Sequence, residues 1–146
     1  HGRVKVKSTA QQEEEKRKER EKKLKVYLTV RDAIFKKRSN SELDEEALQL
    51  TQQLLASNPD FATLWNYRRE ILLHLETVKE EEEMQKLYEA ELLFIESCLK
   101  VNPKSYGSWH HRGWVSSRLP RPDWKRELSL CDRCLSLDDR NCEREG

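Results

Sequence analysis

Glycine and proline are scarce in this sequence, with four residues of each among 146. Both residues interrupt helices, glycine through its backbone freedom and proline through its missing amide hydrogen. Their scarcity leaves few points at which a helix has to end. Leu, Glu, Lys and Arg dominate instead, which is the composition of a helical protein. No segment alternates polar and apolar residues over a useful length, so we expect an all-α fold.

Long hydrophobic runs are absent as well. No run approaches the ~20 apolar residues that a membrane-spanning helix needs. No apolar segment near the first residue has the character of a secretory signal peptide. We therefore expect no membrane span and a reducing compartment, the cytoplasm.

An imidazole beside a free amine can chelate a metal, but we expect His1 to lie in a mobile arm.

Cysteine is limited to four residues, namely Cys98, Cys131, Cys134 and Cys142. The spacing of Cys131 and Cys134 is found in metal and redox sites. A tetrahedral zinc site needs a second Cys or His pair, and the sequence supplies none that would complete it. We therefore expect these cysteines to fill the core, and no metal site in this chain.

The two signs of charge are unevenly distributed. Residues 1–40 hold 14 Lys or Arg and 6 Asp or Glu, a net charge of +8, whereas the remainder holds 14 and 21, a net charge of −7. A solvated helix with many (i, i+4) ion pairs explains this most simply. A basic arm that docks on an acidic surface, or on a nucleic acid, is the alternative. Residues 1–26 contain no aromatic side chain that could stack on bases, so we expect that the chain does not bind a nucleic acid.

Hydrophobic periodicity predicts six helices, over residues 11–38, 44–57, 61–75, 82–101, 105–118 and 123–137, after a mobile arm over residues 1–10. We expect the second half of the first helix to pack through an apolar face, formed by Leu24, Tyr27, Leu28, Ile34 and Phe35. Ser41, with Asp44 three residues later, is a capping signal for the second helix. Asn-Pro steps end the second and fourth helices, because a residue before proline disfavours the α conformation.

Two stretches repeat each other at a distance of 44 residues: "NPDFATLWNYRR" and "NPKSYGSWHHR". The residues that coincide are Asn58 and Asn102, Pro59 and Pro103, Trp65 and Trp109, and Arg68 and Arg112. The helices before each break carry matching stripes, which are Leu48, Thr51 and Leu55, then Leu92, Ile95 and Leu99, then Leu128, Cys131 and Leu135. A single hairpin cannot bury such a stripe alone. We therefore expect an incomplete right-handed α-α superhelix of stacked antiparallel hairpins.

The repeated Trp and Arg lie three residues apart, on one face of a helix. A large ring at the junction between hairpins would fix their distance, and the arginine could stack on an aromatic ring or pair with a carboxylate of the neighbouring helix. We expect Trp65, Trp109, Arg68 and Arg112 to be structural. His110 and His111 have no obvious carboxylate partner in the sequence, so we expect them to serve packing or to lie at the surface.

This constellation is similar to the α subunits of protein prenyltransferases, whose repeat is a helix followed by Asn-Pro-x-aromatic-x-x-x-Trp-x-x-Arg. The first stretch matches that pattern over its whole length, and the second matches it with its aromatic residue, Tyr106, one position further along. The opening "HGRVKVKSTAQQEEEKRKEREKKLKVY" most resembles the Rab geranylgeranyl transferase branch of the family. The resemblance covers residues 1–141, with repeat copies near 44–75 and 82–118, a partial third copy over 123–141, and a tail over 142–146 outside the pattern.

The resemblance implies a crescent of hairpins around a β subunit that holds the catalytic zinc. That heterodimer would transfer geranylgeranyl from its diphosphate to C-terminal cysteines of Rab small GTPases, together with an escort protein. Lys104 would then contact the diphosphate, and Tyr106 would lie near the substrate channel. Judged from the residues alone, Lys104 is more simply a solvated lysine after a helix break. The first copy has Asp60 at that position, so only the second copy suits an anion.

The third copy stops after Asn141, and Glu145 stands where the next Trp is due. We therefore expect a truncated chain whose sixth helix exposes Leu128, Leu135 and Leu137, and which alone does not catalyse transfer. The alternative function is a non-enzymatic adaptor that binds a protein along its concave face.

Overall fold

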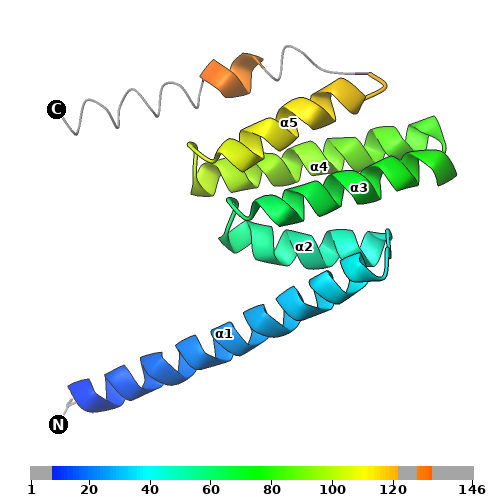
Figure 1. The fold of residues 1–146 in the computed structure, drawn as a ribbon. Helices are drawn as coiled ribbons and strands as arrows, with labels where there is room; N and C mark the ends of the chain where they lie inside the picture. Colours follow the sequence, from blue (N-terminus) through cyan, green and yellow to red (C-terminus); the bar gives the residue numbers. More distant parts are fainter. Residues whose placement is uncertain (1–7, 122–127, 133–146) are drawn as a thin grey trace, which may run out of the picture.

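The computed structural model describes residues 8–121 and 128–132. Its helices are α1 (Thr9–Ser39), α2 (Glu45–Ser57), α3 (Ala62–Val78), α4 (Glu81–Val101) and α5 (Tyr106–Arg118) (Figure 1). These described residues contain helices and turns but no strand, which confirms the all-α prediction. None of these helices combines the length and the apolar character required to cross a membrane.

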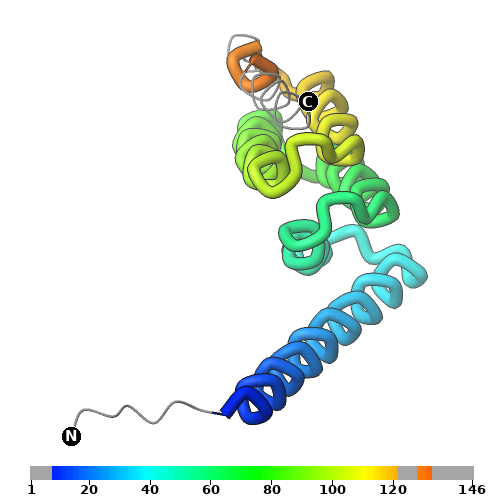
Figure 2. The backbone as a smooth tube through the Cα atoms, turned by 90° about the vertical axis from the view of Figure 1, so that its left-hand side faces the viewer, coloured from blue at the N-terminus to red at the C-terminus, as the bar shows by residue number. Residues whose placement is uncertain are grey.

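The helices stack as antiparallel hairpins. α2 and α3 form one hairpin and α4 and α5 the next, and α2 packs on α4 while α3 packs on α5. In Figure 2 the hairpins therefore make two columns, with α2 and α4 in one and α3 and α5 in the other. The two described stripes that the repeat alignment predicted are buried between the columns, as Leu48, Thr51, Leu55, Leu92, Ile95 and Leu99.

Helix α1 begins earlier than the periodicity predicted. Ser8 caps it through a capping box with Gln11, so that Thr9 and Ala10, which we expected in the arm, belong to the helix. The remainder of the arm, residues 1–7 with His1, lies outside the described residues. In the first half of α1, Arg17 pairs with Glu14 and Glu21 at (i, i+3) and (i, i+4) spacing, as expected of a solvated helix.

The second half of α1 packs less than its periodicity predicted. Ile34 is fully buried, but Leu24 is 56% exposed and Phe35 is exposed as well. Figures 1 and 2 show the reason, since α1 diverges from α2 and only its C-terminal part lies against the hairpin stack. The prediction that Leu24 belongs to the packed face was therefore wrong.

The N-cap of α2 is Asp44 and not Ser41. The carboxylate of Asp44 accepts the amide hydrogen of Ala47 at 2.8 Å and an ammonium hydrogen of Lys37 at 3.0 Å. The hydrogen bond from Ala47 lowers the pKa of Asp44, and Lys37 adds to this effect. Ser41 instead adopts a left-handed conformation with φ of 56° in the turn after α1. The predicted capping box starting at Ser41 is therefore wrong.

Part of the predicted sixth helix is described. Residues 128–132 are helical, with Leu130 buried and Leu128 68% exposed, the latter as predicted for an uncovered stripe. Cys131 is half-buried. The other residues of this prediction, Cys134, Leu135, Leu137 and Cys142 among them, lie outside the described residues.

Candidate functional site

Each repeated Trp closes the Asn-Pro turn of its own copy. The indole N–H of Trp65 donates to the carbonyl of Pro59 at 2.7 Å, and that of Trp109 donates to the carbonyl of Pro103 at 2.8 Å. A turn carbonyl enclosed by helices needs a donor, and a buried indole needs an acceptor. The spacing of six residues between Pro and Trp supplies both at once.

The backbone of the two turns is held in the same way. The carbonyl of Asn58 accepts the amide hydrogen of Phe61 at 3.3 Å, and the carbonyl of Asn102 accepts that of Ser105 at 3.1 Å. In the second turn the side-chain oxygen of Asn102 also accepts the amide hydrogen of Lys104 at 3.1 Å. This Asx-type bond fixes the backbone from which the Lys104 side chain leaves.

The two turns lie directly against each other. The hydroxyl of Ser105 donates to the carbonyl of Pro59 at 3.3 Å, and the side-chain amide of Asn102 donates to Asp60 at 3.4 Å. Because these bonds join residues more than 40 positions apart, they fix the register of one hairpin on the next. The Asn-Pro ends of both copies thus form one continuous surface.

Gly107 allows the closest approach between the hairpins. A Cβ at this position would lie 3.0 Å from Cδ1 and 3.1 Å from Nε1 of Trp65, and 3.3 Å from the carbonyl oxygen of Pro59. The first turn of α5 therefore rests on the Trp65 ring. Sequence reasoning missed Gly107, because the contact depends on the stacking of the hairpins and leaves no local signal.

Lys104 and Tyr106 lie on this surface and both side chains are exposed, Tyr106 to 80%. The ring of Tyr106 stacks on His110 one helical turn later, with ring centroids 5.9 Å apart and planes inclined by 11°. The structure thus brings together a cation and an aromatic platform on the second turn. In the first turn the corresponding position holds Asp60, which is engaged by Asn102.

Arg68 is buried and joins three helices. From α3 its guanidinium binds the carboxylate of Glu91 on α4 with two hydrogen bonds, the one from Nε being 2.7 Å long. Its Nη1 donates to the carbonyl of Leu48 at 2.6 Å and to the hydroxyl of Thr51 at 2.9 Å, both on α2. Pairing with a carboxylate of a neighbouring helix is one of the two roles that the sequence suggested.

Arg112 occupies the equivalent place in the second copy. It is buried, and its Nη1 donates to the carbonyl of Leu92 at 3.4 Å. Leu92 corresponds to Leu48 at the repeat distance of 44 residues, so the two arginines bind the same carbonyl of successive copies. Arg112 also contacts Glu96 at 3.4 Å.

His111 has a carboxylate partner, contrary to expectation. Its Nε2 lies 2.9 Å from Glu91 Oε1, and its Nδ1 lies 3.1 Å from Nη1 of Arg69. Burial lowers the pKa of His111, so the ring is neutral, with Nε2–H donating to Glu91 and Nδ1 accepting from Arg69. The ring is packed between Trp65 and Trp114, at centroid distances of 4.6 and 5.7 Å.

Glu91 is the central anion of this network, and sequence reasoning missed it. Burial alone would raise its pKa, but Arg68 and the hydrogen bond from His111 bring the pKa down to about 2. A helical signal for the histidine was available, because Ser108, His111, Arg112 and Val115 recur at the spacing of one buried face. Arg68, Glu91 and His111 are almost fully buried, and their bonds join three helices, which is an architectural role.

A second cluster joins the opposite ends of the hairpins. Glu76 on α3 accepts hydrogen bonds from the Tyr88 hydroxyl on α4 and from the guanidinium of Arg118 on α5, whose Nε lies 2.9 Å away. The bond from Arg118 lowers the pKa of Glu76, while burial raises that of Tyr88. Both ends of the stack are therefore locked by polar contacts.

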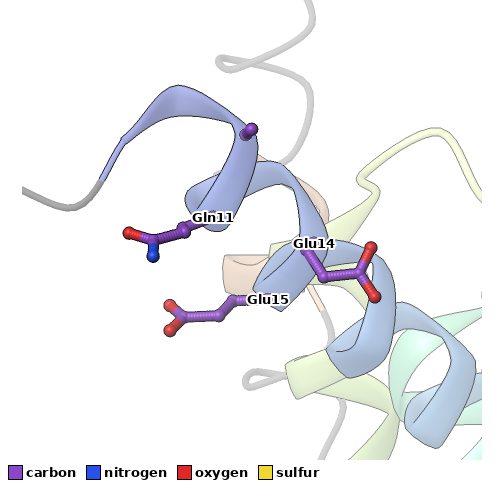
Figure 3. Close-up of a pocket in the computed structure, with 4 residues that line it drawn as sticks. Gln11, Glu14 and Glu15 are labelled. Atoms are coloured by element: carbon purple, nitrogen blue, oxygen red, sulfur yellow. The ribbon is translucent and has the colours of Figure 1, made fainter.

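The described residues offer no group of three or more His, Cys, Asp or Glu side chains that could hold a metal ion. At the start of α1 a pocket is lined by Ala10, Gln11, Glu14 and Glu15, but Glu14 points away from Gln11 and Glu15 (Figure 3). Glu14 is moreover paired with Arg17. Cys98 lies in the core, and burial raises the pKa of its thiol to about 11.

Comparison with known proteins identifies these hairpins. The family described as "Protein prenyltransferase alpha subunit repeat" matches residues 44–75 and 88–119. "Geranylgeranyl transferase type-2 subunit alpha" of Rattus norvegicus is 62% identical over 141 residues, which are 97% of this chain and 25% of the relative. The proteins of that name from Homo sapiens and Dictyostelium discoideum are 60% and 34% identical over 97% of the chain. The chain thus spans about a quarter of the mammalian relatives and 46% of the Dictyostelium protein.

Proposed function

Because this chain belongs to the protein prenyltransferase alpha subunit repeat family, we propose that it is a segment of the alpha subunit of a Rab-type geranylgeranyl transferase. The observation that carries this proposal is the 62% identity to the rat type-2 alpha subunit over 97% of the chain. The stacked Asn-Pro hairpins agree with it. We assign the whole of residues 11–141 to this repeat array. It contains the two matched copies and a partial third copy over 123–141.

The proposed reaction transfers a geranylgeranyl group from its diphosphate to C-terminal cysteine thiolates of Rab small GTPases, in the cytoplasm and with an escort protein. We assign the zinc that activates the thiolate to a β subunit, as the resemblance to the family implies. This chain would serve as scaffold for that subunit and would supply polar groups at the shared edge.

Lys104 is the proposed contact for the diphosphate. The residue is exposed at the paired turns, on a backbone fixed by Asn102. When the bond from the prenyl carbon to the diphosphate breaks, negative charge accumulates on the leaving oxygen, and a fixed cation stabilises that charge. Tyr106 and its stacked partner His110 would border the channel beside it.

The test is Lys104→Ala in the assembled heterodimer with a full-length alpha subunit. We expect turnover to fall by about tenfold to a hundredfold, because one electrostatic contact to the transition state is lost. Association with the β subunit should stay within about twofold. Lys100→Ala, which removes an exposed lysine from the last turn of α4, is the matched control and should leave turnover unchanged.

A loss of association without a loss of turnover per assembled enzyme would show that Lys104 is an interface residue. An unchanged turnover together with retained association would show that Lys104 does not contact the diphosphate.

A further inference from the structure

The divergence of α1 from α2 leaves an apolar groove that the proposed function does not use. The groove has a volume of about 520 Å³. Tyr27 and Val30 of α1 and Leu54 of α2 line its floor. Lys23, Leu24 and Val26 form the rim on α1, and the uncharged Gln53 and Ser57 form the rim on α2.

Apolar surface continues from the groove onto its rim. Leu24 is 56% exposed and Val26 is 62% exposed, whereas Leu54 on the floor is almost fully buried. Scattered single apolar side chains are ordinary on protein surfaces, but apolar residues continuous with a groove mark an interaction surface. The exposed apolar side chains of Leu24 and Val26 extend the apolar surface beyond the groove. The groove therefore suits an elongated macromolecular segment better than a small enclosed ligand.

The only charged residue among those that line the groove is Lys23 of α1, and it lies in a stretch of basic residues. From residue 22 to residue 30, α1 carries Lys22, Lys23 and Lys25 and no acidic residue. From residue 47 to residue 57, α2 carries no charged residue at all. The nearest acidic residue towards the start of α1, Glu21, is paired with Arg17. A segment that fills the groove would therefore meet positive potential along its flank.

The walls of the groove also restrict the backbone of its occupant. Both walls are helices, whose backbone groups are bonded internally, so neither offers an edge to an added strand. An extended peptide would bury amide and carbonyl groups here without partners, which costs free energy. A helix satisfies its own backbone and presents only side chains.

We propose that this groove binds an amphipathic helix of a partner protein, with an apolar face against Leu24, Val26 and Tyr27 and with acidic residues along the flank that meets Lys23 on the rim. This proposal does not depend on the transferase reaction. It would hold equally for an adaptor.

The test uses the whole chain and a fluorescent synthetic peptide of about 18 residues with Leu at i, i+3, i+4 and i+7 and Glu on both flanks. A peptide with Lys in place of every Glu is the control ligand. We expect the acidic peptide to bind at least tenfold more tightly at low salt, with the difference shrinking as salt is added. Val26→Glu should weaken its binding at least tenfold, since it places a charge in the apolar contact.

Val78→Glu is the matched control variant, because Val78 is 64% exposed at the end of α3, away from the groove. It should bind the acidic peptide like the unchanged chain, and circular dichroism should show that both variants keep their helices. Absence of binding, equal binding of both peptides, or indifference to Val26→Glu would overturn the proposal. So would a dimer in sedimentation that Val26→Glu dissolves, since the occupant would then be a second copy of the chain.

Discussion

At the scale of single residues, Gly107 shows how a motif depends on what packs against it. A Cβ at Gly107 would stand 3.0 Å from the buried indole of Trp65, which is held by Pro59 and cannot easily yield. We expect Gly107→Ala to lower the free energy of unfolding by about 1–3 kcal/mol through overpacking. Gly113 lies in the same helix with open space around it, so Gly113→Ala should raise it by about 0.5–1 kcal/mol.

Urea denaturation of the two variants, followed by circular dichroism, measures both changes in one experiment. Two substitutions of the same chemistry should shift the midpoint in opposite directions. If Gly107→Ala were as stabilising as Gly113→Ala, the close approach of the hairpins at Trp65 would be wrong.

His111 and Glu91 predict how stability depends on pH. Burial lowers the pKa of His111 in the fold, so the unfolded chain binds the extra proton first, and stability falls as the pH drops through about 6.5. Arg68 and His111 hold the pKa of Glu91 near 2 against its burial, so its contribution is present above about 4.5 and fades as the pH drops from there towards 2.

The variant His111→Gln separates the two stages, because its amide can still donate to Glu91 but cannot be protonated in this range. We expect this variant to lose the decline of stability that begins near pH 6.5 and to keep the one below about pH 4.5. The measurement is a series of urea titrations between neutral and acidic pH. An identical profile for the variant and the unchanged chain would contradict the assignment of a neutral, buried His111.

At the scale of the elements, the hydrogen bonds of Arg68 link α3 to α2 and α4. Its guanidinium is saturated by Glu91, by the carbonyl of Leu48 and by the hydroxyl of Thr51. Replacing it with Met leaves the ionised Glu91 buried beside His111 alone, so we expect a loss of about 3–5 kcal/mol of unfolding free energy. Adding Glu91→Leu removes the unpaired charge and should recover part of that loss.

Urea unfolding of the two single variants and the double variant forms the cycle that measures this coupling. Effects that simply add would contradict the direct pairing of Arg68 with Glu91. Removal of the exposed pair between Arg38 and Glu70 serves as a reference, with a coupling of about 0–1 kcal/mol expected.

The ends of α2 and α4 were predictable from the sequence because Asn-Pro breaks are local signals. The end of α4 at Val101 and the start of α5 beside Ser105 follow from Asn102 and Pro103 directly. The cap of α2 was misassigned because Ser41 and Asp44 are both good capping residues, and the turn geometry after α1 decides between them.

The site was less predictable than the helices, because its contacts join residues that are distant in the sequence. The pair of His111 and Glu91 spans 20 positions, and the contact of Gly107 with Trp65 spans 42. No local pattern reports either of them. Packing of α1 was overestimated for a related reason, since periodicity shows which face of a helix is apolar but not how far a neighbour extends along it.

At the largest scale, residues 8–121 form a stack of two hairpins and a diverging helix, with the Asn-Pro turns side by side. We propose that catalysis belongs to the β subunit and that this chain contributes only the edge of the site. The isolated chain is therefore expected to show no transfer of geranylgeranyl to a small GTPase. Transfer by the purified chain in the absence of a β subunit would refute this division of roles.

The most direct measurement replaces the matching segment of the rat relative's alpha subunit with residues 1–141 of this chain and assays geranylgeranyl transfer by the assembled heterodimer. We expect the chimera to assemble and to retain turnover within about tenfold of the parent, and we expect Lys104→Ala in the chimera to lower turnover without releasing the β subunit. A chimera that assembles but fails to transfer, or one in which Lys104→Ala changes nothing, would contradict it.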